Sequence, residues 1–250
     1  PWTFPSVPSI LTGYYPHQHG ARYEEDYRNP ESNFPPNGLA EDIPSLFNLL
    51  DAAGYNTRFS TAVYTAGIPF QGRVPTLKFR NNVAAEEILD KFADWWRGAN
   101  DRPQFGYLHL TDLHIPLFDP GIRPFGSIDF ELNDLSDWAF RSTVEPSEEF
   151  EHYREHRVKL YDTLLRYVDA ELKRFFATLD GDLDDTLVIV LGDHGEEFWE
   201  HHEIERKLFE HPYGDYGIDH GHSLFQEVVN VPLIVKNAQT RSNIREEYVS

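Results

Sequence analysis

The chain has 250 residues, of which 40% are hydrophobic and 14% aromatic, so it can bury the core of one large α/β domain. Its 42 acidic and 22 basic residues give a formal net charge of −20, and such a surface repels phosphate backbones, so we expect no nucleic-acid partner. No apolar run is long enough to span a membrane, and the absence of Cys excludes disulfides, thiolate metal sites and a Cys nucleophile.

Prolines divide the first segment, residues 1–13. We expect them to break any helix before Ser6, and we expect Ser6 to cap a helix over residues 6–11. A helix N-terminus is a good anion site, and Thr3 lies just upstream of this one. The Thr3 hydroxyl needs activation before it can act as a nucleophile.

Residues 43–110 alternate between helix and strand patterns. Apolar residues at helical spacing predict helices over residues 43–54, where a Gly ends the pattern, and over residues 84–96. Short apolar runs predict strands over residues 56–64 and 105–110. The second of these strands leads into a polar turn.

The C-terminal half begins with residues 118–157, which are rich in Asp, Glu, Pro and aromatic residues and predict an insertion or lid. Helical spacing then predicts a long helix over residues 153–179. Residues 186–191 and 231–235 are continuous apolar runs, which are typical of buried parallel strands. The alternation predicts an α/β fold with a mostly parallel central sheet flanked by helices, in which ligands bind beyond the carboxyl ends of the strands.

The sequence G-D-H-G-E at residues 192–196 follows one of these strands. Asp193 and His194 offer oxygen and nitrogen donors that suit Zn²⁺, Mn²⁺ or, with more oxygen, Ca²⁺. The alternative is a tight turn whose Asp caps the next helix. The preceding strand favours a metal site, because it places the pair at the binding edge of the sheet.

A second cluster, D-H-G-H-S, contains His220 and His222. Either imidazole can supply a further metal ligand, and the alternative is a solvated His-rich loop. The nearby His201, His202 and His211 are interpreted as surface residues.

His114 follows the strand predicted at residues 105–110. A His in this position can donate a proton to a leaving group or hold an anion. The alternative is a structural His that is satisfied by Asp112.

Together these segments resemble the sulfatase family of the alkaline phosphatase superfamily. The family carries C/S-x-P-S-R, then L-T-G and Y-P-x-x-x-G, and this chain has T-F-P-S-V at residues 3–7, L-T-G at 11–13 and Y-P-H-Q-H-G at 15–20. The same order continues with P-x-L-x-x-x-L-x-x-x-G-Y-x-T, D-P-H-x-P, the long helix with its metal strand, and H-G-x-x-L-Y-x-E with V-P-L-I-V. Their counterparts here are residues 44–57, 112–116, 161–169 with 186–196, 220–227 and 231–235.

The resemblance implies a three-layer α/β sandwich in which residues 1–250 form part of a sulfatase-like catalytic domain. It also implies that the family's first strand, with its metal-binding Asp residues, and its small C-terminal antiparallel subdomain lie outside these residues.

The implied activity is metal-dependent hydrolysis of sulfate or phosphate esters, on small molecules or glycans, with Ca²⁺, Zn²⁺ or Mn²⁺. Thr3 falls at the nucleophile position, which also binds metal, and Asp193 and His194 fall on metal ligands. His220 falls on a later basic position that binds metal or substrate, with His222 as its nearest competitor. His114 falls on the His that contacts the anion or the leaving group.

The chain departs from the sulfatase pattern at the nucleophile. Sulfatases use a formylglycine made from Cys or Ser, which Thr3 cannot form, and Val7 replaces the Arg of the modification motif. Residues 58–70 contain neither the Lys nor the His of the sulfate pocket. A Thr nucleophile instead resembles the superfamily's phosphodiesterases and phosphatases, and its ester intermediate must be attacked directly, which favours phosphoryl chemistry. Two alternatives are a non-catalytic relative that binds an anionic glycan and a transferase of phospho-groups.

The cations are mostly Arg with only a handful of Lys, beside many carboxylates. This composition resembles that of halophilic proteins from a high-salt cytoplasm, where screening suppresses self-repulsion. We therefore expect a cytoplasmic location, and an ordinary acidic protein is the alternative.

Overall fold

The computed structural model describes residues 2–22, 38–74, 77–79, 83–98, 101–114, 117, 147–179, 183–208, 217–237 and 244. The helices are α1 (Thr3–Thr12), α2 (Pro16–His19), α3 (Leu46–Ala52), α4 (Tyr64–Gly67), η1 (Ile68–Phe70), α5 (Ala85–Arg97), α6 (Glu148–Thr178), α7 (His202–Leu208) and α8 (Gln226–Val229). The strands are β1 (Asn56–Thr61), β2 (Leu77–Phe79), β3 (Gln104–His109), β4 (Val188–Leu191), β5 (Glu197–Phe198), β6 (Ile218–Asp219) and β7 (Leu233–Lys236).

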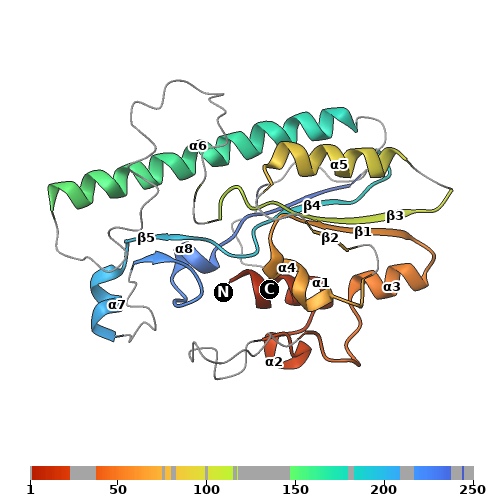
Figure 1. The fold of residues 1–250 in the computed structure, drawn as a ribbon, viewed down its shortest axis with the longest axis horizontal. Helices are drawn as coiled ribbons and strands as arrows, with labels where there is room; N and C mark the ends of the chain where they lie inside the picture. Colours follow the sequence, from red (N-terminus) through yellow and green to blue (C-terminus); the bar gives the residue numbers. More distant parts are fainter. Residues whose placement is uncertain are drawn as a thin grey trace.

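The central sheet is parallel and has the strand order β2-β1-β3. Helices α5 and α6 lie on one side of the strands, and α1, α3 and α4 lie on the other (Figure 1). This arrangement confirms the predicted fold class, a parallel sheet with helices on both faces. The carboxyl ends of β1 and β3 pair at Thr61 and His109, so both strands deliver their following loops to one edge.

The two faces of β3 serve different cores. Phe105 and Tyr107 pack against the cluster that contains Phe59 of β1 and the α1 side chains, whereas Leu108 packs against α5 and α6. This alternation follows from the two-residue period of a strand. Gly106 lies on the α5 side, where a Cβ would overlap the Phe92 ring, so only Gly lets the helix approach this closely.

Strands β4 and β7 differ from their prediction. They form an antiparallel two-stranded sheet of their own rather than buried parallel strands. Ile189 on β4 is 51% exposed and Ile234 on β7 is 61% exposed. Apolar composition alone therefore misled the prediction, because an apolar run is buried only where another element covers it, and Ile189 and Ile234 are left more than half exposed.

The N-terminal helix also differs from its prediction. Helix α1 begins at Thr3, with extended Trp2 before it, and contains both Pro5 and Pro8, so the expected cap at Ser6 is wrong. Pro5 is tolerated because the amides of a first helical turn need no partner within the helix. Helix α3 is shorter than the predicted 43–54, because Ser45 accepts the Asn48 amide and caps it.

Helix α6 begins at Glu148, five residues before its predicted start, with Ser147 accepting the amide of Phe150. The C-terminal part of the predicted lid, residues 148–157, is therefore helix. Most of the remainder of the predicted 118–157 insertion lies outside the described residues.

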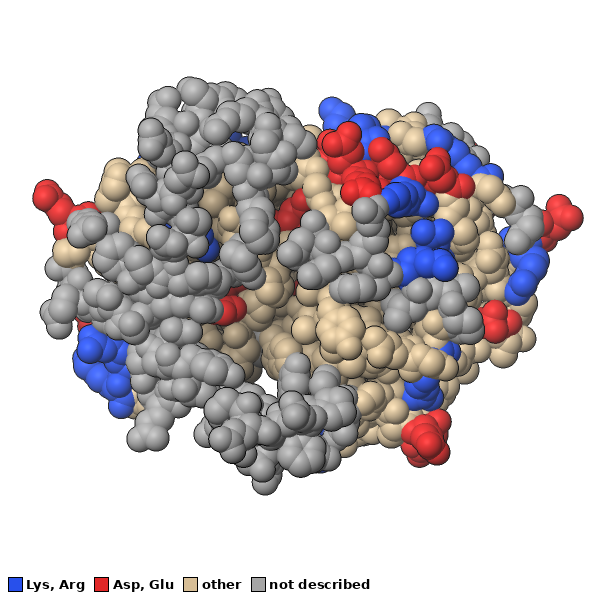
Figure 2. All heavy atoms as spheres, viewed as in Figure 1, with Lys and Arg blue, Asp and Glu red and all other residues tan. Residues whose placement is uncertain are grey.

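Helices α5 and α6 are joined by charge as well as by packing. Arg174 of α6 contacts Asp90 of α5 at 2.6 Å and Glu171 of its own helix at 2.7 Å. Acidic and basic side chains lie side by side over these helices in Figure 2. Across the sheet edge, Asp112 accepts the amide of Ala85 at 3.0 Å and so caps α5 from the loop after β3.

Among the described helices, none combines the length and the apolar character that crossing a membrane requires.

A buried imidazole fixes the turn after α2. The His19 Nδ1 accepts the amide of Ala21 at 3.1 Å, so the proton of the neutral ring is on Nε2, which lies 3.1 Å from Ser9 Oγ. Burial lowers the pKa of His19 below its ordinary value. A second proton would have to enter at Nδ1, where it would face an amide donor.

We predict that this ring makes the protein less stable in acid. Because the folded pKa is below the unfolded one, the contribution is complete above the unfolded pKa and is lost progressively as the pH falls from that value through the folded pKa. The free energy of unfolding, measured with urea between pH 8 and pH 5, should fall less steeply in His19→Asn, whose amide oxygen can still accept from Ala21. His17→Asn, at an exposed position of the same helix, is the control. Equal pH slopes for His19→Asn and the wild type would contradict the prediction.

Candidate active site

Four separate segments meet at one end of the sheet. They are the first residue of α1, the turn after β3, the loop after β4 and the short antiparallel ribbon formed by β5 and β6. Contacts between side chains link them in sequence: Thr3 to His194, His194 to His220, and His220 to His114. The edge predicted to bind ligands therefore carries these four predicted site residues, with Asp193 beside His194.

Thr3 and His194 lie 191 residues apart in the sequence, and their side chains are in hydrogen-bond contact. The Thr3 Oγ1 lies 3.1 Å from His194 Nε2, and the other ring nitrogen, Nδ1, lies 2.8 Å from the carbonyl oxygen of Gly195. A carbonyl can only accept, so Nδ1 carries the proton and the neutral ring presents the Nε2 lone pair to the Thr3 hydroxyl. Burial lowers the pKa of His194, which favours this neutral form.

Asp193 lies beside the same nitrogen. Its Oδ2 is 3.5 Å from His194 Nε2 and 4.0 Å from His109 Nε2 on β3. This oxygen is buried and accepts no hydrogen bond from the described residues. A buried carboxylate oxygen without a hydrogen bond is costly unless a cation lies against it. The His109 ring is itself held by Tyr107, whose hydroxyl lies 3.2 Å from Nδ1.

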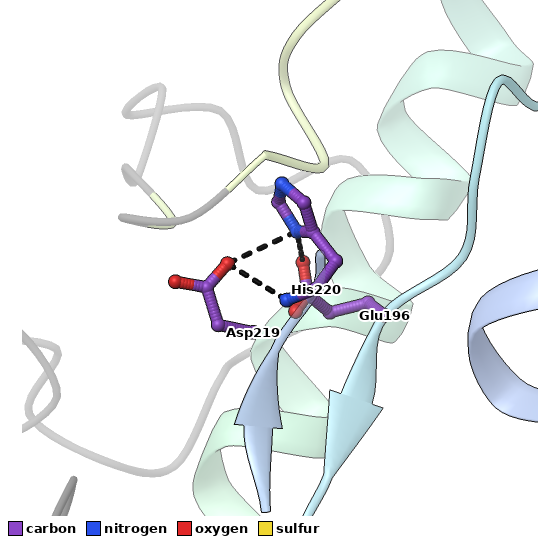
Figure 3. A group of neighbouring side chains, drawn as sticks. All are labelled: Glu196, Asp219 and His220. Carbon is purple, nitrogen blue, oxygen red and sulfur yellow. Dashed lines mark hydrogen bonds and ion pairs between the residues drawn. The ribbon is translucent and has the colours of Figure 1, made fainter. Parts of the chain in front are cut away.

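The β5–β6 ribbon carries the next group, Glu196, Asp219 and His220 (Figure 3). The His220 Nδ1 lies 3.1 Å from Glu196 Oε2 and 3.1 Å from Asp219 Oδ1, so two carboxylates orient one imidazole. Burial, and then the charge of Asp219, raises the pKa of Glu196 well above its ordinary value. Asp219 has a φ of +83°, a left-handed conformation that is strained for a residue with a side chain.

Three imidazoles stand together at this edge. The His194 and His220 rings have centroids 3.9 Å apart, and the His114 ring meets His220 edge-on at 5.1 Å. Burial lowers the pKa of His220, as it does for His194, so these two rings are held neutral. Neutral imidazoles beside buried carboxylates are suited to binding a cation.

His222 lies in a different group. Its Nε2 is 3.1 Å from Glu205 Oε1 and 3.9 Å from Glu197 Oε2, and we call these three residues the inner cluster. The sequence placed His222 as an alternative to His220, but the structure gives each imidazole its own pair of carboxylates. Burial raises the pKa of Glu197 to about 7, and the nearby Glu205 adds to the shift.

The loop 193–196 is held by α8. The amides of Gly195 and Glu196 donate to the carbonyls of Val228 and Glu227 at 2.8 Å and 3.1 Å. A Cβ at Gly195 would overlap the Glu227 carbonyl oxygen, so the loop can lie this close only with Gly at this position. The alternative of a simple Asp-capped turn is not seen, because the Asp193 Oδ2 is held beside imidazoles.

The sequence missed several members of this site. Glu196 and Asp219 belonged to the quoted clusters but were given no role, and His109 was taken only as part of a strand. The signal for His109 was its place at the carboxyl end of β3. His201, interpreted as a surface residue, is half-buried and lies 3.1 Å from Glu227. His202 is also half-buried, and His211 lies outside the described residues.

The donor set fits a divalent cation. Glu196, Asp219 and His220 each offer a ligand atom within 4.8 Å of the others. The Asp193 Oδ2 and the Glu196 Oε1 are buried and accept no hydrogen bond from the described residues, and the lone pair of His194 Nε2 faces Thr3. Carboxylate oxygens and neutral imidazoles of this kind are the ligands that Zn²⁺ and Mn²⁺ take.

Comparison with known proteins gives one family. The family model described as Sulfatase matches residues 1–250. No curated protein matches the chain.

Three solved structures share the fold. The phosphonate monoester hydrolase of Agrobacterium radiobacter is 16% identical with a TM-score of 0.57, over 95% of this chain and 59% of that one. The C-terminal periplasmic domain of EptC from Escherichia coli, in complex with Zn, is 16% identical with a TM-score of 0.56, over 94% and 58%. A 2-O GAG sulfatase is 18% identical with a TM-score of 0.52, over 94% and 54%. The chain therefore spans less than two thirds of the length of these neighbours.

We predict that Gly195→Ala lowers the free energy of unfolding by about 1–3 kcal/mol, the usual cost of forcing extra volume into a filled space. The added methyl group would overlap the Glu227 carbonyl oxygen. To relieve this overlap, the loop must move away from α8 and lose its backbone hydrogen bonds to that helix. Urea denaturation measures the change. Gly38→Ala is the matched control, because a Cβ there meets its nearest neighbour at an ordinary 3.6 Å. A cost for Gly195→Ala no greater than that for Gly38→Ala would show that the close approach is not needed.

Proposed function

Because this chain belongs to the sulfatase family, we propose that it is a metal-dependent hydrolase of sulfate or phosphate esters with Thr3 as the nucleophile. One observation carries the proposal: the Thr3 hydroxyl lies 3.1 Å from His194 Nε2, beside the unsatisfied Asp193 carboxylate. A hydroxyl from the start of α1 meets an imidazole and a carboxylate from the loop after β4 at one buried point. That is the arrangement a phosphoryl or sulfuryl transfer needs.

Thr3 is positioned by its helix. It is the first residue of α1, it is only 2% exposed, and its neighbours Phe4 and Val7 are buried in the core beneath the sheet. The positive end of the helix dipole therefore lies at the hydroxyl, where it favours negative charge on the attacking oxygen and on the substrate anion. The rigid support removes conformational freedom from the nucleophile before the reaction starts.

The residues that would hold the cation are Asp193, His194 and Thr3, with the Glu196, Asp219 and His220 group beside them. When bound, a divalent ion lowers the pKa of a hydroxyl in its coordination sphere and neutralises charge on an anionic ester. Zn²⁺, Mn²⁺ and Ca²⁺ all fit the proposal, and the nitrogen donors favour the first two.

The reaction would proceed in two displacements. Thr3 Oγ1 attacks phosphorus or sulfur and forms a covalent ester, its proton passes to solvent, and the alcohol leaves. His114 holds or protonates the leaving oxygen, and His220 faces the same space from the β5–β6 ribbon. Water then attacks the phosphorus or sulfur and restores the Thr3 hydroxyl, which releases inorganic phosphate or sulfate from a monoester substrate and a phosphate monoester from a diester substrate.

The Thr3 side chain favours a phosphate ester over a sulfate ester. A formylglycine can release its anion by collapse of a hemiacetal, whereas a Thr ester must be opened by direct attack on the central atom. We therefore infer that phosphate diesters or monoesters are the better substrates, and that a glycan or a small molecule carries the ester.

We predict that Thr3→Ala lowers kcat for an aryl phosphodiester or an aryl sulfate by at least about a thousandfold, because it removes the hydroxyl that we propose forms the covalent ester. The rate is measured with added Zn²⁺, Mn²⁺ or Ca²⁺. Thr3→Ser should retain part of the activity. Thr163→Ala on α6 removes a Thr hydroxyl that bonds only its own helix and should leave the rate unchanged. Full turnover by Thr3→Ala would remove Thr3 as the nucleophile.

We predict that Asp193→Asn weakens Zn²⁺ binding by at least about tenfold, because it removes the charge of an oxygen that lies beside His194 Nε2. Equilibrium dialysis of the folded protein measures the affinity without any substrate. Asp51→Asn, at an exposed position on α3, is the control for loss of one negative charge. Unchanged affinity in Asp193→Asn would exclude this carboxylate as a ligand.

A further inference from the structure

The inner cluster of Glu197, Glu205 and His222 is built from three elements. Glu197 lies on β5, Glu205 on α7, and His222 follows β6. Each residue offers a ligand atom, and these atoms all lie within 4.8 Å of one another. The cluster plays no part in the two displacements proposed for Thr3.

The cluster concentrates negative charge in the interior. Glu197 and Glu205 are both 0% exposed. Among the described residues, no Lys or Arg forms an ion pair with either carboxylate, and His222 is the cationic partner that both share. Two buried carboxylates against one imidazole leave a net negative charge, which is expensive in a medium of low polarity.

The geometry of the three side chains is that of ligands around one ion. The buried Oε1 of Glu205 lies 3.1 Å from His222 Nε2, at ion-pair distance. Glu197 Oε2 lies 3.9 Å from the same nitrogen. Ligands on tetrahedral Zn²⁺, with bonds of about 2.0–2.1 Å, are separated by roughly 3.3 Å, so small movements of these side chains would place all three around a common centre.

Neighbouring groups hold each ligand in place. The amide of Gly217 donates to Glu205 Oε2 at 2.6 Å, which leaves Oε1 turned towards His222. The amide of His201 donates to Glu197 Oε1 at 3.1 Å. The hydroxyl of Ser223, which follows His222 in the chain, donates to Glu197 Oε2 at 3.4 Å. Such supporting bonds orient ligands in protein metal sites.

The inner cluster is separate from the site of Thr3. Glu196 and Glu197 are adjacent, and Glu196 contacts His220 whereas Glu197 contacts His222. Glu196 immediately precedes β5 and Glu197 is its first residue, and their separate contacts show that the two carboxylates point apart. Gly221, with a φ of +91°, turns the chain between the two imidazoles.

We propose that Glu197, Glu205 and His222 form a second metal site, which binds one Zn²⁺ ion and joins β5, α7 and the segment after β6. Two carboxylates and one imidazole neutralise the ion, and a water molecule supplies the fourth position of a tetrahedron. The ion has a structural role: it cancels the buried charge and fixes the ribbon that carries Glu196, Asp219 and His220.

Counting the metal tests the proposal without any substrate. The full chain is equilibrated with Zn²⁺, freed of excess metal and analysed for zinc per chain by elemental mass spectrometry. We expect Glu205→Gln to bind one equivalent less than the wild type and to retain the equivalent that Asp193→Asn loses. Glu203→Gln, an exposed position on the same helix, should bind as the wild type does.

Cobalt gives an independent reading of the site. Co²⁺ in a four-coordinate site absorbs visible light strongly, and this band should be reduced in Glu205→Gln and in His222→Gln but not in Glu203→Gln. Should Glu205→Gln fail to fold by circular dichroism, His222→Gln provides the zinc count in its place. A full wild-type count of zinc in these folded variants overturns the proposal. A zinc count that falls only in Asp193→Asn overturns it as well, and that result leaves the proposed function of Thr3 intact.

Discussion

The contact between Thr3 and His194 is the interaction on which the site depends. It joins the first turn of α1 to a loop 191 residues later, at 3.1 Å. Neither partner is free to move: α1 is anchored by Phe4 and Val7 in the core, and the His194 ring is fixed through its Nδ1 by the carbonyl of Gly195. The proposed nucleophile and the imidazole proposed to bind the metal are thus held next to each other by the fold before any substrate arrives.

The acidity of the chain takes two forms. On α5 and α6 the carboxylates meet Arg side chains at the surface, where each pair contributes little to stability. At the sheet edge the carboxylates are buried and meet imidazoles instead. The buried carboxylates create a negative potential in the interior that favours a bound cation. We interpret this potential as the basis of both proposed metal sites.

Much of the fold and part of the site could be predicted from the sequence. The parallel sheet and the edge that carries Asp193, His194 and His114 followed from helix–strand alternation and from polar clusters after apolar runs. The partners of His220 and His222 could not be predicted, because the sequence does not show which carboxylates are buried. Glu205, in the first turn of α7, has the same sequence pattern as a solvent-exposed Glu at the start of a helix.

The failures have physical causes as well. The helix that begins at Thr3 accommodates Pro5, because the amides of its first turn need no partner within the helix. The expectation that proline breaks a helix does not hold within that first turn. The apolar run of β4 indicated burial, but composition says nothing of what lies against a strand. Local pattern determines an element, whereas burial and pairing depend on partners far away in the chain.

The loop that contains Gly195 helps to fix the pairing of β4 with β7. Strand β4 leads into the loop, the loop is hydrogen-bonded to α8, α8 leads into β7, and β7 returns to pair with β4. Residues 188–191 and 233–235 are all apolar and specify the alignment of the two strands weakly, since a slip exchanges one hydrophobic side chain for another. A slip by one residue would carry the loop about 3.3 Å, beyond the reach of its bonds to α8. The hydrogen bonds between α8 and the loop therefore fix the register in which β4 and β7 pair.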